Sequence, residues 1–106
     1  MKKSRVYIAG RVGDVSDPNV LRIRQANFER REKALARLGY KAVNPMKIVP
    51  QGTEWKDAMR ICLKALCDCD YISLLPDWRL SEGAMLEAHV AEVLEIPQVY
   101  PSAMND

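Results

Sequence analysis

The stretch YISLLPDWRLSEGAMLE, residues 71–87, passes from an apolar run into a break and then into a helical pattern. The run at 71–75 is typical of a buried strand, and Pro76 and Asp77 favour a turn after it. Ser81 suits the N-cap of the next helix, because its hydroxyl can accept a hydrogen bond from an amide of the first turn. The stretch therefore predicts a strand, a turn and a helix that begins near the carboxyl end of that strand.

Gly83 and Glu87 lie four residues apart, so they share one face of this helix. A glycine in the first turn costs helix stability relative to alanine, which indicates that something approaches the backbone there. The missing side chain would leave an open floor beside the Glu87 carboxylate. Ligands of open α/β sheets bind at the carboxyl edge, so we interpret the segment as a candidate site. Helices without any function also contain serine caps and glutamates, and that alternative stays open.

The alternation of strand and helix patterns extends over the rest of the chain. Gly39 is expected to end the first helix at the C′ position, and Thr53 is the expected N-cap of the second. The apolar positions of the first two helices follow a helical period: Val20, Ile23, Phe28, Leu35 and Leu38, then Met59, Cys62, Leu63 and Leu66. The expected strands are Arg5–Ala9, Lys41–Asn44, Asp70–Leu75 and Pro97–Tyr100, and the expected helices cover about 20–38, 54–67 and 82–95.

This alternation requires crossover connections and predicts an α/β fold with a parallel sheet. We predict a flavodoxin-like three-layer sandwich, with a four-stranded parallel sheet in the order 2-1-3-4, helices on both faces, and one domain over residues 1–106. The switch point then lies between the first and third strands, at Gly10-Arg11 and Pro76-Asp77. Two loops would therefore converge on Ser81 and Glu87.

Length and composition are those of one small globular domain. The 106 residues are 48% hydrophobic and 28% charged, which is ordinary for a soluble protein. No apolar run approaches the roughly 20 residues that span a bilayer. The basic N-terminus precedes only a strand-length apolar run, unlike a signal peptide. We expect a cytoplasmic protein that does not bind a membrane.

Charge is distributed unevenly along the chain. Residues 1–41 carry 11 Lys and Arg against 4 Asp and Glu, a balance of +7, and residues 42–106 carry 5 against 10, a balance of −5. The basic half could attract phosphate or nucleic acid. The one aromatic residue among its basic helix positions, Phe28, belongs to the apolar face, so we do not expect nucleic acid as a partner. We expect a solvated helix face formed by Arg22, Arg24, Arg30, Arg31, Lys33 and Arg37.

The cysteines indicate neither a disulfide framework nor a metal site. Cys62, Cys67 and Cys69 are odd in number in a chain without an export signal. Zinc would want four ligands, and the single histidine, His89, lies on another predicted helix. We expect no metal and no cofactor, and we interpret the three cysteines as buried small hydrophobic residues.

Several segments resemble the nucleoside 2-deoxyribosyltransferase-like superfamily, and the resemblance covers nearly the whole chain. They are Tyr7-Ile8-Ala9-Gly10, Asp70 before the third strand, and Ser81-x-Gly83-x-x-x-Glu87. A group of small proteins within it shares the Asn44-Pro45-Met46 and Cys69-Asp70 segments. The better understood relatives are the deoxyribosyltransferases and the deoxynucleoside 5′-monophosphate N-glycosidases.

The resemblance implies roles for individual residues. Glu87 would attack C1′ of a deoxyribose and form a glycosyl-enzyme intermediate, and Tyr7 would lie near the nucleobase or the nucleophile. Ser81 stands where the transferases have an aspartate, as in the monophosphate glycosidases, where a serine helps to hold the 5′-phosphate. Arg11 would be a second phosphate ligand, since a helix N-terminus, a hydroxyl and a guanidinium suit that group. The expected substrate-binding residues are Tyr7, Gly10, Arg11, Asp77, Ser81 and Gly83.

One position departs from the family pattern. The family usually has an aspartate that contacts the substrate where this chain has Cys62, and a thiol cannot replace a carboxylate as an acceptor or as a proton donor to a base. Catalysis would then be weak, altered or lost. Asp77 could supply a carboxylate, or be only a turn residue after a proline. Asn44 and Trp78 could both line the pocket. Alternatively, Asn44 caps a strand end and Trp78 packs at a dimer interface.

Two functions follow. The first is cleavage or transfer of the N-glycosidic bond of a deoxynucleoside or its 5′-monophosphate by double displacement, which Glu87 favours. The second is a catalytically silent nucleotide-binding module, which Cys62 favours. A weaker third is association of the basic helix with nucleic acid, which salt would abolish. Relatives complete the pocket across a dimer and sheet edges need cover, so we expect a homodimer or a higher homo-oligomer.

Overall fold

The computed structural model of the chain describes residues 2–13 and 15–100. Its fold is α/β, as the alternating pattern predicts. The elements in chain order are β1 (Arg5–Ala9), α1 (Pro18–Arg37), β2 (Lys41–Val43), α2 (Pro45–Ile48), α3 (Trp55–Cys67), β3 (Tyr71–Leu74), the 3₁₀ helix η1 (Trp78–Leu80) and α4 (Glu82–Val93).

The sheet is parallel and has three strands in the order β2-β1-β3. The central strand β1 reads as a continuous apolar run because both of its faces are covered, and its residues 6–9 are fully buried. The carboxyl ends of β1 and β3 lie side by side, since Ala9 pairs with Leu74. The loops that follow these two strands therefore start at the same edge of the sheet.

The described residues do not contain the predicted fourth strand. Residues 97–100 run beside β3, but they make a single parallel bridge between Ile72 and Gln98. The Ile72 amide donates to the Pro97 carbonyl at 3.0 Å, and the Val99 amide donates to the Ile72 carbonyl at 2.9 Å. Pro97 has no amide hydrogen, which limits the ladder that this segment can form.

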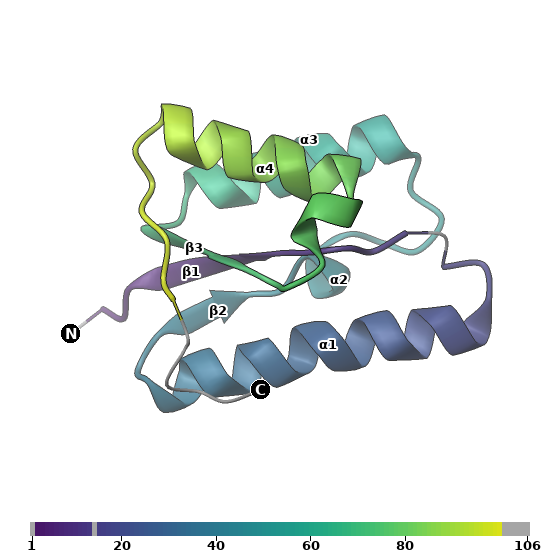
Figure 1. The fold of residues 1–106 in the computed structure, drawn as a ribbon, viewed down its shortest axis with the longest axis horizontal. Helices are drawn as coiled ribbons and strands as arrows, with labels where there is room; N and C mark the ends of the chain where they lie inside the picture. Colours follow the sequence, from purple (N-terminus) through teal and green to yellow (C-terminus); the bar gives the residue numbers. More distant parts are fainter. Residues whose placement is uncertain (1, 14, 101–106) are drawn as a thin grey trace.

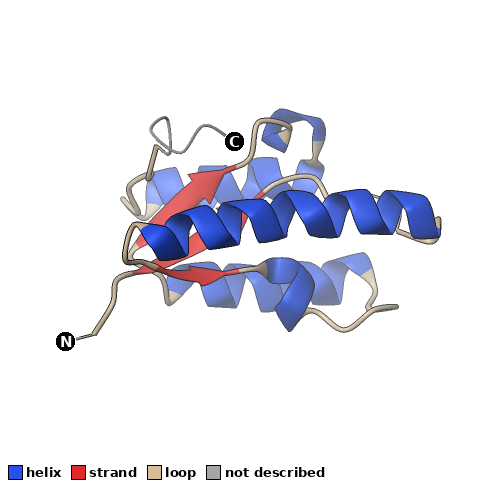
Figure 2. Ribbon diagram, turned by 90° about the horizontal axis from the view of Figure 1, so that it is seen from below, coloured by secondary structure: helices blue, strands red, loops and turns tan. Residues whose placement is uncertain are grey.

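Helices cover both faces of the sheet: α3 and α4 lie on one face, and α1 lies on the other (Figure 1). Seen from the side of α1, that helix runs across the sheet (Figure 2). Successive side chains of β1 alternate between the two layers. Tyr7 and Ala9 pack in the cluster that contains the α3 and α4 residues, whereas Val6 and Ile8 pack with Phe28 and Leu35 of α1. This alternation points Tyr7 toward α3 and α4.

The first helix differs from its prediction in its start and in its buried face. It begins at Pro18, because Asp17 caps it by accepting a hydrogen bond from the Asn19 amide at 2.8 Å. Ile23 and Leu38 are exposed. Gly39, with φ of 92°, follows the helix end as predicted.

Arg31 does not belong to the solvated basic face that the sequence predicts. It lies three residues after Phe28 and four before Leu35, so helical geometry places it on the stripe that faces the sheet. It is 4% exposed and donates from Nη1 to Ser73 Oγ at 2.9 Å and to the Leu74 carbonyl at 3.0 Å.

Two helix starts after β2 also differ from the prediction. Asn44 caps the short α2 by accepting a hydrogen bond from the Met46 amide at 3.0 Å. Thr53 is not the cap of α3: Glu54 occupies that position without a side-chain hydrogen bond, and the Thr53 hydroxyl donates to the Pro50 carbonyl at 2.6 Å.

The three cysteines are free thiols, and Cys67 is exposed rather than buried as predicted. Among residues 2–13 and 15–100, no three histidine, cysteine, aspartate or glutamate side chains are grouped to hold a metal ion. No helix of this described part is long and apolar enough to cross a bilayer.

Candidate active site

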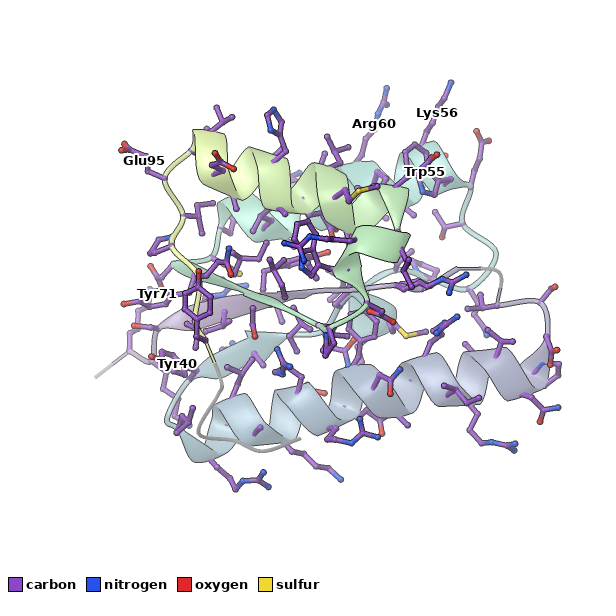
Figure 3. All side chains as sticks on the ribbon, in the orientation of Figure 1. Tyr40, Trp55, Lys56, Arg60, Tyr71 and Glu95 are labelled. Carbon is purple, nitrogen blue, oxygen red and sulfur yellow. The ribbon has the colours of Figure 1, made fainter. Side chains whose placement is uncertain are left out.

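A cavity of about 540 Å³ opens at the carboxyl edge of the sheet. Its wall is made by the loop after β1, by the first half of α1, by α2 and the loop after it, by α3 from Trp55 to Cys62 and by the start of α4. In Figure 3, Trp55 marks the end of the molecule where the cavity opens, and Tyr40, Tyr71 and Glu95 lie at the other end. The lining includes Tyr7, Arg11, Trp55, Cys62, Ser81 and Glu87.

Three polar side chains from three different elements meet in this cavity. Glu87 lies on the inner face of α4 with Ala84 and Ala91, and it is 5% exposed. The Tyr7 hydroxyl donates a hydrogen bond of 2.6 Å to Glu87 Oε2. The Cys62 thiol, from the inner face of α3, packs in the same cluster as Tyr7 and lines the same cavity as Glu87. The sequence prediction that β1 and the helix after β3 share one site is thus met by a direct contact.

Burial sets the protonation of this group. It raises the pKa of Glu87 to about 7, against the opposing effect of the hydrogen bonds from Tyr7 and Cys62. Burial also raises the pKa of Cys62 to about 11, and burial together with the neighbouring Glu87 raises the pKa of Tyr7 well above its ordinary value. Near neutral pH the site therefore combines a carboxyl that is poised between its two forms with two neutral donors.

A cationic side chain lies at another part of the cavity wall. The guanidinium of Arg11 makes no hydrogen bond or ion pair within the described part of the chain. Ser81 caps α4, and its Oγ accepts a hydrogen bond from the Ala84 amide at 3.1 Å. The hydroxyl hydrogen of Ser81 is left for a ligand, and the first amides of α4 point the same way. This arrangement can bind an anion.

Asp77 lies beside the cavity but does not line it. Its Oδ1 accepts a hydrogen bond from the Arg11 backbone amide at 3.1 Å, and its Oδ2 lies 3.9 Å from Arg24 Nη1. The residue therefore ties the loop after β1 to the loop after β3. These contacts hold the Arg11 backbone in place, and direct contact of Asp77 with a substrate stays a prediction.

Two glycines allow the close packing around the site. A Cβ at Gly10 would lie 2.5 Å from Leu75 Cδ1, and one at Gly83 would lie 3.0 Å from Met59 Sδ. The floor beside Glu87 that the sequence predicts to be open is therefore occupied by Met59. Both glycines still line the cavity.

A family profile described as a domain of unknown function, DUF4406, matches residues 4–100. The chain belongs to the DUF4406 family. No curated protein matches the chain. The family description names no activity.

Two further residues that the sequence associated with the pocket of this DUF4406 chain lie elsewhere. Asn44 caps α2 and donates from Nδ2 to Glu32 Oε1 at 3.3 Å. Trp78 lines a separate depression of similar volume between β3, the outer side of α4 and residues 96–100. The Arg79 guanidinium lies 4.7 Å from the centre of the Trp78 ring.

Sequence reasoning missed the wall of the cavity that is formed by α2, the loop after it and the start of α3. It also missed Leu21 and Gln25 of α1; the other missed lining residues include Met46, Val49, Pro50 and Trp55. A signal for α2 was present, because asparagine followed by proline is a typical N-cap and first helical residue.

Proposed function

We propose that this DUF4406 protein cleaves or transfers the N-glycosidic bond of a deoxynucleoside or its 5′-monophosphate, with Glu87 as the nucleophile. The observation that carries the proposal is the buried Glu87 carboxyl in a cavity of about 540 Å³, held by Tyr7 at 2.6 Å. A concave site with few convergent polar groups at the carboxyl edge of a parallel sheet is the usual place for a small ligand. The reaction type comes from the resemblance to the nucleoside 2-deoxyribosyltransferase-like superfamily.

The proposed reaction is a double displacement. An oxygen of ionised Glu87 bonds to C1′ while the C1′–N bond breaks, and the base leaves with the bonding electron pair. Water or a second base then attacks C1′ of the glycosyl ester and loses a proton, the departed base gains a proton, and the Glu87 carboxylate is regenerated. Two inversions at C1′ retain the configuration, as in retaining glycosidases.

Tyr7 acts on the orientation of the nucleophile in this proposal. Its phenol is neutral, so it can donate to the carboxylate, and the hydrogen bond fixes one oxygen and leaves the other to face C1′. Arg11 and Ser81 are the proposed ligands of a 5′-phosphate, supported by the unpaired guanidinium and by the N-terminus of α4.

A second candidate function is a silent nucleotide-binding module. The observation that favours it is the neutral thiol of Cys62 beside Glu87. A carboxyl group at this position could protonate a departing base, and a neutral thiol does not replace it. The module would keep the cavity, the anion ligands and Glu87, but would bind a nucleotide without turnover.

The deciding experiment is incubation with the deoxynucleosides and their 5′-monophosphates, followed by chromatography for free base. We expect release by the wild-type protein and loss of release in Glu87→Gln, because an amide is not a competent nucleophile toward C1′. Glu92→Gln is the matched control, since Glu92 is an exposed residue of the same helix. Equal release by wild type and Glu87→Gln would remove Glu87 from the mechanism, and binding without release would establish the silent module.

We also infer a flavodoxin-like arrangement and a homo-oligomer. The strand order β2-β1-β3 supports the first, and the Gln98 bridge marks where a fourth strand would join the sheet. The second is supported by α4, which exposes Met85, Leu86, Val93 and Leu94 although such side chains are usually covered. A cytoplasmic location remains a prediction from the sequence.

A further inference from the structure

The inner end of the cavity provides one carboxyl group and no second acid. Glu87 is joined there by the Tyr7 phenol and the Cys62 thiol. Within the described residues, the lining contains one other carboxyl, Glu82, and no lysine or histidine. Glu82 is exposed, and it stands five residues from Glu87, which turns it roughly 140° around the helix axis. Glu82 therefore does not face Glu87 across the cavity.

The missing acid limits which bases can leave. A neutral base that departs from C1′ with an electron pair needs a proton, and a positioned general acid contributes roughly 10²–10⁴-fold to such a step. The Tyr7 hydrogen is already donated to Glu87. Burial raises the pKa of Tyr7 and Cys62, so neither group gives up its proton readily. A base that already carries a positive charge on its ring needs no proton, because it leaves as a neutral molecule.

The wall that contains Trp55 suits a cationic ring, whereas Arg11 of the same cavity suits an anion. Trp55, which is 53% exposed, lines the cavity, and a tryptophan ring attracts positive charge. The neighbouring wall residues Met46, Val49 and Met59 are apolar, so they do not compete for the charge. A positive ring placed near Glu87 also favours the ionised form of this carboxyl, which is the form that attacks.

From this geometry we propose that Glu87 acts on N-glycosides of positively charged heterocycles, such as pyridinium rings or N7-alkylated purines, in preference to those of neutral bases. The inference rests on the proposed function, since it specifies the leaving group of the same reaction. One Glu87 oxygen bonds to C1′, the C1′–N⁺ bond breaks, and its electron pair neutralises the ring nitrogen. Water then hydrolyses the ester, so that each turnover yields free sugar, neutral base and one proton.

A matched pair of probes tests the proposal: 7-methyl-2′-deoxyguanosine and 2′-deoxyguanosine, each with and without a 5′-phosphate. They differ in one methyl group, which fixes a positive charge on the purine. Because the methylated nucleoside also loses its base spontaneously, the rate with Glu87→Gln is subtracted in each case. We expect wild-type kcat/KM to be at least about 100-fold higher for the methylated probe, within the range that a general acid supplies.

Cys62→Asp tests the cause. A carboxyl at this position would supply the missing acid, so we expect the ratio of guanine release to 7-methylguanine release to rise by about tenfold or more. Cys62→Ser keeps the size without the acidity and should retain the wild-type preference. Trp55→Leu should raise KM for the methylated probe, and Trp78→Leu, outside the cavity, should not.

The outcomes separate this inference from the proposed function. Wild-type kcat/KM values within tenfold of each other would overturn the inference and leave the glycosidase proposal standing. A preference that Cys62→Asp, folded by its melting temperature, leaves unchanged would overturn the assignment to a missing acid. If Cys62→Asp does not fold, the ratio of the wild-type kcat/KM values for the two probes still tests the preference for a cationic base. No release above Glu87→Gln from either probe would overturn both proposals.

Discussion

The Tyr7 hydroxyl donates a 2.6 Å hydrogen bond to Glu87 Oε2 across a separation of 80 residues in the chain. Two features of the fold produce this contact. The alternation of side chains along β1 turns Tyr7 toward α3 and α4, and the position of Glu87 three residues after Ala84 turns it toward the sheet. Both side chains are buried, so neither can exchange its partner for bulk water.

Tyr7→Phe should slow base release. The substitution keeps the ring and removes the donor, which leaves the buried carboxylate less well solvated and raises the pKa of Glu87 further. Hydrogen bonds to charged groups contribute about 1.5–3 kcal/mol, so kcat/KM near neutral pH should fall by roughly 10- to 100-fold. The pH profile of kcat/KM should move to higher pH at the same time. A reduced rate with an unchanged profile would mean that Tyr7 contacts the substrate instead.

Base release should rise with pH through about 7 and reach a plateau above about 8, because the nucleophile is the ionised form and the pKa of Glu87 is about 7. The profile of kcat/KM for a substrate without groups that titrate in this range measures it directly. A rate that falls over the same interval would instead assign Glu87 the role of a proton donor.

The same carboxyl should make stability depend on pH. Its pKa is about 7 in the folded protein and near the ordinary 4.5 in the unfolded chain. Between these values the folded state holds more protons than the unfolded state, so the free energy of unfolding should fall as pH rises through this window, by on the order of 3 kcal/mol. Urea unfolding at pH 5 and pH 8 would show the loss in wild type, and Glu87→Gln should lack this component. Equal pH dependence in both proteins would contradict the shifted pKa.

Much of this arrangement was readable from the sequence, where local patterns and the global fold agree. The apolar run of β1, the break after β3 and the Ser81 cap are local signals, and a parallel sheet brings two strand ends together. These signals were sufficient to place Tyr7, Arg11, Ser81 and Glu87 on one cavity.

The parts that sequence reasoning missed depend on tertiary packing. Nothing local shows that the Met59 side chain fills the space beside Gly83, or that a buried Arg31 bonds to Ser73 and Leu74. A hydrophobic period alone treats an arginine as a surface residue. The described residues show three strands instead of the predicted four, because residues 97–100 have the composition of a strand but form one bridge.

Alanine substitutions at the two close-packed glycines should differ in their effects on stability. At Gly10 the new Cβ would lie within 2.9 Å of three atoms of the Leu75 side chain, which is itself buried, so the cost should be about 1–3 kcal/mol. At Gly83 the nearest atom is the sulfur of a flexible Met59 at 3.0 Å, and alanine is the better helix former. Urea unfolding should therefore give a clearly higher free energy of unfolding for Gly83→Ala than for Gly10→Ala. Equal losses would show that Met59 is as fixed as Leu75.

Arg11→Ala should weaken the binding of deoxynucleoside 5′-monophosphates while leaving that of nucleosides nearly unchanged. The Arg11 guanidinium lines the cavity without a partner, and its backbone is anchored by Asp77 at 3.1 Å. Charge-assisted hydrogen bonds of this kind contribute about 1.5–3 kcal/mol each, so the loss in affinity should be roughly tenfold or more. Calorimetry in the Glu87→Gln background avoids turnover.

Arg22→Ala is the matched control, because it removes the same charge from an exposed arginine that bonds to Asn19. A similar loss in both variants would indicate a long-range effect of net charge, and equal affinity of the parent protein for nucleoside and monophosphate would remove the phosphate site altogether.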